Sequence, residues 1–461
     1  MRPTRLAPWL AVALLPLHVL CLPSETAQGQ DSPWKVGLAH VKITPTEPVF
    51  LAGYSSRNKP FTGVESDLYA KALALEDSQG FRAVLITSDL IGFRGSIAEP
   101  ICERIMAQTG LKRSQILINS SHTHTGPTLS LEASPRDLFT AADAQRTVEY
   151  TRSVQDKVTD LAVRALADMT PARLAWGVGV VHFPMNRRQF TPQGVILGAN
   201  PRGLADRTVP VLRIDAPDGK LRAVLFGAAV HNTTLRPKHY EICGDYAGFA
   251  QEYLQQQYPE VQAMFMLGCA GDADPYPFGS MELARQHGQT LGTEVSRILK
   301  GELRPIRGPL RIAFDRVDLP LQQLERSELE ELARPERGVL PGVARQMLAV
   351  LDRGQALPRH YNCPATVWQF GQDLTLVGLS GEVVVDYVTM IEHALGPQPL
   401  WLAAYCNDVF GYLPSARLLD EGGYETRGIF AGGPGLFDHT AQDVLVAKIR
   451  ELAAQVRATP K

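Results

Sequence analysis

The chain is poor in cysteine, and none of its six cysteines belongs to a Cys-x-x-Cys pair. Zinc sites built from thiolates use such closely spaced pairs, so we do not expect a cysteine-based metal site. Cys21 lies in the N-terminal apolar stretch, which leaves five cysteines in the rest of the chain. A chain of 461 residues can bury a core large enough to fold without disulfides, so buried free thiols are expected.

An excess of charge of either sign is also absent. The 46 basic residues nearly balance the 48 acidic ones, and no polybasic run is present. This balance offers no electrostatic surface for nucleic acid, which we exclude as a partner. Beyond the N-terminus, no segment approaches the ~18 consecutive apolar residues that cross a bilayer. A hydrophobic content of 45% excludes a disordered chain.

The N-terminus has the composition of a targeting segment. Two arginines precede an apolar run from Leu6 to Leu20, and a small-x-small site follows at Ala27-Gln28-Gly29. This order is typical of a signal peptide, which we predict at residues 1–29. We therefore expect a soluble mature chain, secreted or periplasmic. An uncleaved anchor or a lipoprotein site at Cys21 would be the alternatives.

Short apolar runs alternate with amphipathic helical segments along the rest of the chain. No Gly-x-Gly-x-x-Gly follows the first strand, so a Rossmann fold is excluded, whereas a (β/α)₈ barrel is not excluded by the pattern alone. We predict an α/β (mixed α+β) fold of layered mixed β-sheets flanked by helices, in a single large catalytic domain over residues 30–461. The stretches near 303–308 and 354–359 are either linkers or loops. Strands are expected at residues 34–43, 68–75, 83–86, 115–119, 173–181, 209–214, 221–230, 261–267, 366–370, 374–379 and 400–404, and helices at 97–108, 141–167, 246–257, 282–299, 383–394 and 440–456.

One predicted strand ends on the segment Ser121-His122-Thr123-His124-Thr125-Gly126-Pro127. Two histidines at i and i+2 of an extended segment point the same way, so His122 and His124 could face one site. Neutral imidazole is a common zinc ligand, and the ends of strands are where layered folds assemble their sites. The pattern favours a metal site, and histidines that only cap the strand by hydrogen bonding are the plain alternative.

Three further polar residues follow strand-like runs. His231 comes in Ala-Val-His-Asn-Thr-Thr, Glu382 follows Ser380-Gly381, and Tyr412 ends Cys-Asn-Asp-Val-Phe-Gly-Tyr. Taken singly, each has a structural interpretation. The histidine could be a core residue whose hydrogen bonds are made within the protein. The glutamate could begin a helix and be stabilised there by the helix dipole, and the tyrosine could be an ordinary core residue.

Taken together and in this order, these segments resemble the catalytic region of the neutral (non-lysosomal) ceramidase family. The similarity begins at Ile43-Thr44-Pro45 and Leu51-Ala52-Gly53-Tyr54 and ends at Tyr424-Glu425. Between them it includes Met185-Asn186-Arg187 and Gly271-Asp272-Ala273-Asp274-Pro275. The resemblance implies a Zn²⁺-dependent amidohydrolase that acts on an N-acyl lipid, such as the conversion of N-acylsphingosine to a sphingoid base and a fatty acid.

The resemblance also implies roles for individual residues. His124 matches a second histidine beside the metal, and Arg187 matches an arginine that could stabilise negative charge developing on the acyl oxygen. Zinc would polarise the scissile carbonyl and lower the pKa of its water, and His124 or Asp274 would take the proton. The zinc ligands implied by the family are His122, His231, Glu382 and Tyr412.

Two departures from the family put ceramide in doubt as the substrate. Asp274 stands where the family has a serine implicated in catalysis, and the chain leaves no room for the C-terminal β-sandwich domain of longer ceramidases. One alternative is therefore a zinc hydrolase of a non-sphingolipid amide or ester, such as an acylated sugar. Another is a catalytically silent binding protein. The oligomeric state and peripheral contact with a membrane are left open by the sequence.

Overall fold

Two mixed β-sheets form the centre of the fold, in a computed structural model that describes residues 34–132, 140–429 and 434–457. The predicted signal peptide lies outside the described residues. The larger sheet consists, in spatial order, of β12 (Gln262–Leu267), β10 (Leu221–Ala228), β9 (Thr208–Asp215), β6 (Thr170–Val180), β1 (Trp34–Lys42), β3 (Tyr69–Asp77), β4 (Arg82–Ser88) and β5 (Ile116–Ser120), with β14 (Arg304–Ile306) paired to β6. The smaller sheet consists of β15 (Leu310–Pro320), β16 (His360–Phe370), β17 (Leu374–Leu379) and β19 (Leu400–Ala403).

Alternate side chains along the strands face opposite ways, as the pleat of a strand requires. Leu73 of β3 and Leu85 of β4 share a buried apolar cluster with Trp368 of the smaller sheet. The preceding residue of β4, Val84, belongs instead to the cluster formed with the first two helices. The two sheets therefore pack face to face, and helices cover their outer faces.

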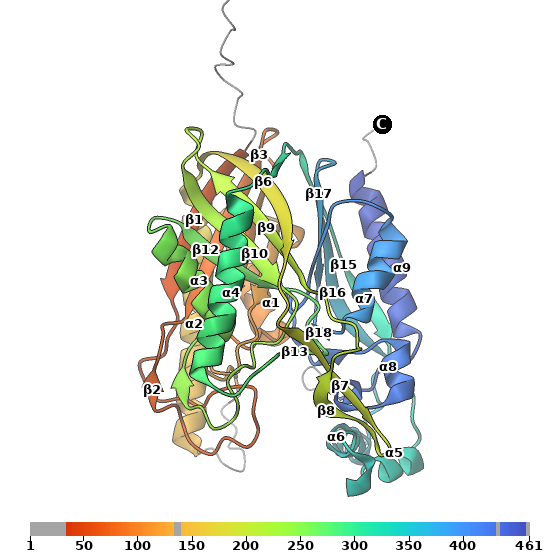
Figure 1. Ribbon diagram of the computed structural model, residues 1–461. Coiled ribbons are helices and arrows are strands. Elements are labelled where there is room, and N and C mark those ends of the chain that lie inside the picture. The colour runs from red at the N-terminus through yellow and green to blue at the C-terminus, as the bar shows by residue number, and fades with distance from the viewer. Residues whose placement is uncertain (1–33, 133–139, 430–433, 458–461) are drawn as a thin grey trace, which may run out of the picture. The chain divides into compact units, whose positions relative to one another are not determined.

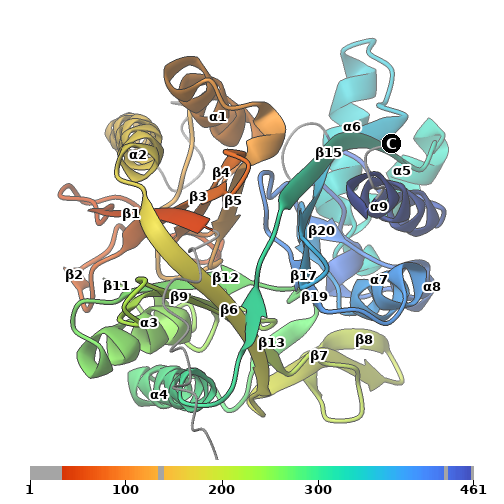
Figure 2. The ribbon, with the colours of Figure 1, turned by 90° about the horizontal axis from the view of Figure 1, so that it is seen from above.

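The helices form the two outer layers of this arrangement. Figure 2 shows helices around the larger sheet and on the outer side of the smaller one, and Figure 1 gives the same layers from the side. The larger sheet is covered by α1 (Gly95–Thr109), α2 (Ala141–Ala167), α3 (Asp245–Gln257) and α4 (Met281–Leu299), and the smaller sheet by α7 (Asp386–Leu395) and α9 (Ala441–Arg457).

The remaining elements are short. A three-stranded sheet consists of β13 (Ala273–Pro275), β7 (Pro184–Thr191) and β8 (Gly194–Asn200). Two further pairs of strands are β2 (Gly63–Val64) with β11 (Glu241–Ile242) and β18 (Glu382–Val383) with β20 (Tyr412–Leu413). The short helices are α5 (Arg326–Leu332), α6 (Pro341–Asp352) and α8 (Ala416–Glu421), and the 3₁₀ turns are η1 (Arg113–Gln115), η2 (Pro335–Arg337) and η3 (Tyr424–Thr426).

The predicted fold class is confirmed, and the (β/α)₈ alternative is wrong. Most neighbouring strands are antiparallel, with parallel pairs only at β4–β5, β10–β12 and β17–β19 within the two main sheets of the described chain. The five cysteines of the described residues are free and buried, as expected. In the same part of the chain, none of the helices combines the length and apolar character that crossing a membrane requires.

Candidate metal centre and active site

Three strands of the two sheets end at one place and bring polar side chains together there. His122 follows β5, His231 follows β10 and Glu382 follows β17. Backbone contacts join these ends, since Thr123 forms a parallel bridge with Asn232. The site is thus assembled by main-chain pairing between segments that are far apart in the sequence.

The histidine segment reaches the site in a conformation that the sequence does not reveal. β5 ends at Ser120, and His122 has a φ of 60°, in the left-handed region that non-glycine residues rarely adopt. The predicted extended conformation is therefore wrong at this residue. The backbone N–H of His122 donates to the carbonyl oxygen of Leu90 over 2.9 Å, which holds the turn in place.

The ring nitrogens of His122 and His231 are arranged as in a metal site. The Nδ1–H of His122 donates to the carbonyl of Ile91 at 2.5 Å, and that of His231 donates to the carbonyl of Ala270 at 2.6 Å. In a neutral imidazole with this tautomer, Nε2 carries the lone pair that can bind a metal, and both Nε2 atoms face Oε2 of Glu382, at 3.2 and 3.0 Å. Backbone carbonyls that fix the tautomer in this way are the usual support of metal-binding histidines.

A cation explains why three acceptors approach one another. Two lone pairs directed at a carboxylate oxygen repel it unless a positive charge lies between them. Ligands about 2.1 Å from a tetrahedral zinc lie about 3.4 Å from one another, which is close to the separations between these three atoms. The donor set of His122, His231 and Glu382 could therefore hold a metal ion.

The protonation states also suit metal ligands. Burial, together with the nearby guanidinium of Arg187, lowers the pKa of His231 below its usual value. Burial raises the pKa of Glu382, but the two histidines outweigh it and hold that pKa well below its ordinary range. A neutral imidazole and an ionised carboxylate are the forms that bind a metal.

The imidazole of His124 lies beside this cluster and has no hydrogen-bond partner among the described residues. Both ring nitrogens are buried without a partner. The ligand atoms of His122, His124 and His231 all lie within 4.8 Å of one another. Burial, reinforced by the two neighbouring histidines, holds the pKa of His124 well below its usual value. A neutral imidazole without a partner is suited to hold a proton or a polar group of a ligand here.

Gly53 packs against His124 and is expected to be required for its position. Gly53 has a φ of +88°, and a Cβ there would lie 2.3 Å from Nδ1 of His124. We expect Gly53→Ala to displace the imidazole and to lower kcat/KM about tenfold or more. Gly80→Ala is the matched control, because Gly80 has a φ of +80° and no atom within 4 Å of its added Cβ. Equal activities of the two variants would contradict the expectation.

Tyr412 reaches the site from the strand beside Glu382. β18 and β20 are parallel, and Glu382 and Tyr412 are paired residues. Glu382 therefore does not open a helix, as its sequence context had suggested, because α7 begins only at Asp386. The Tyr412 ring lies nearly parallel to that of His231, at 6.4 Å between centroids. Its hydroxyl accepts a hydrogen bond from Nη2 of Arg187 at 2.9 Å.

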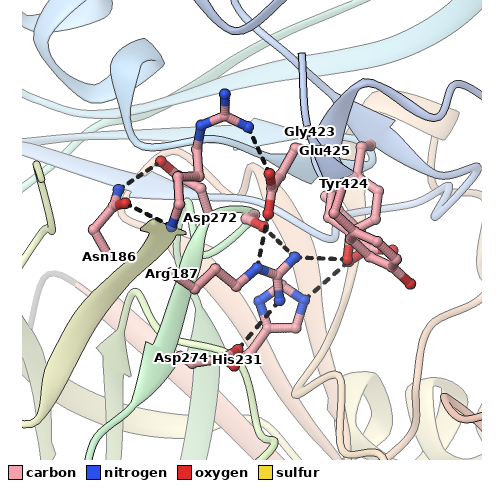
Figure 3. A network of polar contacts seen from close by, with 12 residues as sticks. Asn186, Arg187, His231, Asp272, Asp274, Gly423, Tyr424 and Glu425 are labelled. Carbon is pink, nitrogen blue, oxygen red and sulfur yellow. Dashed lines mark hydrogen bonds and ion pairs between the residues drawn. The ribbon is translucent and has the colours of Figure 1, made fainter. Parts of the chain in front are cut away.

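Arg187 is enclosed by acceptors. Figure 3 shows its guanidinium between Asp274 and Glu425. Nε donates to Glu425 at 2.9 Å and Nη1 to Asp274 at 3.2 Å, while Nη2 donates to the Gly271 carbonyl at 2.7 Å as well as to Tyr412. All four of these hydrogen bonds go to protein groups of the described structure, and one of them goes to the Tyr412 hydroxyl. Arg187 therefore holds Tyr412 in place.

Asp274 is the second neighbour of that arginine. It accepts from Arg187, from the hydroxyl of Thr233 at 3.1 Å and from Nη2 of Arg236 at 3.1 Å. Burial raises its pKa, but the positive charges around it outweigh burial and lower the pKa to about 2. Asp274 is therefore a tightly held carboxylate, and it is a weak base.

The charge of Asp274 is expected to stabilise the fold in a pH-dependent manner. Its pKa of about 2 in the folded chain lies below the ~3.9 of an unfolded aspartate. The stabilisation, about 2 kcal/mol, is present above pH ~4 and lost as the pH falls toward 2. Urea unfolding should show Asp274→Asn to be less stable than the parent at pH 7, with a smaller difference at pH 3. A difference independent of pH would contradict this role.

A cavity of about 500 Å³ opens onto the cluster. His122, His124, Glu382 and Tyr412 are part of its wall, whereas Asp274 is not among the residues that line it. The sequence did not indicate Arg94 or Arg427 as site residues, because no local pattern marks them, and it indicated Tyr424 only as part of the last segment of the family resemblance. The rest of the wall includes the apolar residues Phe50, Leu51, Ile91, Leu129 and Val409.

A family model described as neutral/alkaline non-lysosomal ceramidase, N-terminal, matches residues 34–275, just over half of the chain. The chain belongs to this ceramidase family. Neutral ceramidase A of Dictyostelium discoideum is 22% identical over 265 residues, covering 55% of this chain and 36% of that protein. Neutral ceramidase of Drosophila melanogaster is 23% identical over 235 residues, with coverages of 49% and 32%. The matched part is thus about a third of the length of these curated ceramidases.

Solved ceramidase structures share the fold. The crystal structure of neutral ceramidase from Pseudomonas aeruginosa superposes with a TM-score of 0.72 at 20% identity, covering 94% of this chain and 76% of that one. A ceramidase complexed with C2 gives a TM-score of 0.73 at 20% identity, with coverages of 94% and 77%. The resemblance inferred from the sequence motifs is therefore confirmed at the level of family and fold.

Proposed function

We propose that this member of the ceramidase family is a zinc-dependent hydrolase that cleaves the amide bond of an N-acyl compound. The observation that carries the proposal is the pair of anchored imidazoles whose Nε2 atoms face one carboxylate oxygen, beside a partly apolar cavity. When bound there, zinc would supply Lewis acidity and a water of lowered pKa. The residues proposed to hold it are His122, His231, Glu382 and Tyr412.

His124 is the proposed proton acceptor. It lines the cavity, its nitrogens have no other described partner, and its lowered pKa keeps it neutral. It would accept the proton of the attacking water and return it to the leaving amine. Asp274, the other candidate, has a pKa of about 2 and is not among the residues that line the cavity.

Arg187 and Asp274 are proposed to act through Tyr412. Asp274 fixes the guanidinium of Arg187, and Arg187 donates to the Tyr412 hydroxyl. Burial holds the pKa of that hydroxyl well above its usual value, and the fixed positive charge of Arg187 opposes this shift and so favours the ionised form that a metal ligand requires. Arg187 also adds positive potential near the charge that develops on the acyl oxygen.

A non-sphingolipid amide or ester is the second candidate for the substrate. Asp274 favours it, because a carboxylate cannot supply the hydroxyl that the family serine would offer. An acyl chain would still fit the apolar side of the cavity, formed by Phe50, Leu51, Ile91 and Leu129. We also propose that the chain is exported with residues 1–29 removed, which N-terminal sequencing of the mature protein would test.

Metal analysis and a substrate panel test the function. We expect about one zinc per chain, and turnover of fluorogenic N-acyl substrates that ends when a chelator removes the metal. Matched O-acyl substrates and N-acylsphingosine would show which bond and which amine are accepted. A chain that holds zinc yet hydrolyses no member of the panel would be a binding protein, and the proposal would fail.

A further inference from the structure

The imidazole of His124 differs from those of the two proposed histidine ligands in how it is held. His122 and His231 are each anchored through Nδ1 to a backbone carbonyl, whereas neither ring nitrogen of His124 has a hydrogen-bond partner among the described residues. The orientation of the His124 ring must therefore come from packing around it and from the position of its main chain. A group that fixes this main chain also fixes the proposed proton acceptor.

The main chain of His124 is hydrogen-bonded on both sides. Its N–H donates to the carbonyl of Asn232 at 3.2 Å. Its own carbonyl accepts from Nη1 of Arg57 at 2.5 Å, although the two residues are 67 positions apart in the sequence. Arg57 lies in the connection between β1 and β2 and is 3% exposed. A buried guanidinium from a distant segment thus holds the carbonyl side of His124.

The same guanidinium joins three segments of the chain. Nη1 of Arg57 also donates to the carbonyl of Ala52 at 2.6 Å, Nη2 donates to that of His239 at 3.1 Å, and Nε donates to that of Pro237 at 3.4 Å. Burial lowers the pKa of Arg57 to about 10, so the group remains a cation at neutral pH. A planar guanidinium carries donors in several fixed directions, and it can therefore hold the loop before β2, the histidine segment and the connection between β10 and β11 together.

Tyr54 connects this arginine to the ring of His124. The guanidinium of Arg57 lies over the Tyr54 ring, 4.8 Å from its centroid, and the Tyr54 ring packs edge-on against the imidazole of His124, at 4.8 Å between centroids. The Tyr54 hydroxyl donates to the carbonyl of Leu235 at 3.0 Å, which fixes the far end of the ring. Arg57 therefore contacts both the main chain of His124 and the aromatic ring that supports its imidazole.

We propose that Arg57 is a positioning residue for the hydrolysis, because it holds the main chain of His124 and, through Tyr54, the ring, so that the imidazole faces the cavity. This inference rests on the proposed hydrolase function, in which His124 accepts the proton of the attacking water. His122 is held by backbone and ring hydrogen bonds of its own, so the zinc content should not depend on Arg57. A displacement of about 1 Å in a proton acceptor lowers turnover about a hundredfold.

Two substitutions of Arg57 test this role by kinetics on the fluorogenic N-acyl substrate that the parent enzyme prefers. Arg57→Met removes every donor and keeps the apolar part of the side chain, so kcat should fall about a hundredfold while KM changes less than about threefold. Arg57→Lys keeps the charge without the fork and should lose about tenfold. Full activity of Arg57→Lys would show that the charge alone suffices and would overturn the inference. A raised KM with unchanged kcat would make Arg57 a substrate-binding group and would also overturn it.

Arg213→Met is the matched control. Arg213 also donates to a backbone carbonyl, that of Leu299 at 2.8 Å, and it forms an ion pair with Asp215. Its partner across the sheet is Val224, within β10, so it lies away from the end of the strand that His231 follows. We expect kcat and zinc content to stay within about twofold of the parent. A loss of kcat equal to that of Arg57→Met would contradict a specific role of Arg57.

A double substitution separates positioning from a general loss of structure. If Arg57 acts through His124, a chain without that imidazole has no proton acceptor left for Arg57 to position. Adding Arg57→Met to His124→Gln should therefore lower kcat less than about twofold beyond the single His124→Gln variant. A second loss of about a hundredfold in the double variant would mean that Arg57 acts independently of His124, and the inference would be wrong.

Hydrogen exchange of the zinc-loaded chain separates this inference from the proposed function, because it requires no turnover. In Arg57→Met the backbone amides of residues 122–126 and 236–240 should exchange at least about tenfold faster than in the parent, since both segments lose the same guanidinium. Faster exchange in both segments supports the hold on the main chain even if no amide substrate is hydrolysed. Unchanged exchange in both segments overturns it even if amides are hydrolysed.

Discussion

Glu382→Gln is expected to abolish zinc binding and to lower kcat/KM at least about a thousandfold. The substitution preserves the volume of a side chain that is 5% exposed, so the fold should survive it. It removes the negative charge that both imidazoles face, at 3.2 and 3.0 Å. Without that charge the two neutral nitrogens would hold a divalent cation weakly.

The measurement combines zinc content per chain with kinetics on the preferred amide. Glu149→Gln is a suitable control, because Glu149 is an exposed carboxylate of α2 whose described hydrogen bond is to Gln145. Its zinc content and activity should equal those of the parent. If Glu382→Gln kept its zinc and its activity, the proposed ligand set would be wrong.

Glu425→Gln is expected to destabilise the folded chain by about 3 kcal/mol, the largest effect on stability that we foresee. Glu425 is fully buried, and it accepts from Nε of Arg187 at 2.9 Å and from Nη1 of Arg188 at 2.7 Å. Loss of its charge leaves two buried guanidinium groups short of a compensating carboxylate. Chemical denaturation of the parent and the variant measures the difference.

Glu421→Gln is the matched control for that experiment. Glu421 also accepts from Arg188, at 3.0 Å, but its side chain is 21% exposed, so water can replace part of the interaction. We expect a loss below about 1 kcal/mol. Similar losses in the two variants would contradict the claim that the buried carboxylate organises this network. Weaker zinc binding in Glu425→Gln alone would further link the network to Tyr412.

The features that the sequence predicted best are those that depend on residues adjacent to one another along the chain. The periodicity of apolar residues placed α2 at residues 141–167, where the structure has it, and located the strands that lead to His122 and His231. The pattern also placed strands at residues 366–370 and 374–379, which the structure pairs as the antiparallel hairpin of β16 and β17. In each case the signal lies within one segment, so a local pattern suffices.

Features produced by pairing between distant segments were missed. β7 carries Asn186, Arg187, Arg188 and Gln189, a polar run without a strand pattern, and its pairing with β8 and β13 makes it a strand. Glu382 looked like the first residue of a helix because its partner Tyr412 is 30 positions away.

Arg57 gave no local signal either, because the carbonyls that hold it come from three separate segments. Of the candidate residues, local patterns therefore pointed to His122, His124, His231 and Glu382, and the family resemblance added Tyr412, Arg187 and Asp274. Neither indicated the arginines that line the cavity.

The distances along the chain between the proposed ligands have a consequence for when the site can form. Main-chain pairing that requires both sheets joins the segments that carry His122, His231, Glu382 and Tyr412. A nascent chain synthesised only as far as residue 381 would therefore lack two of these four proposed ligands. The full set of proposed ligands is then available only after residue 412 has been synthesised. If the chain crosses a membrane unfolded, the ion would be acquired in the compartment of arrival, and the supply of zinc there would limit how much active protein accumulates.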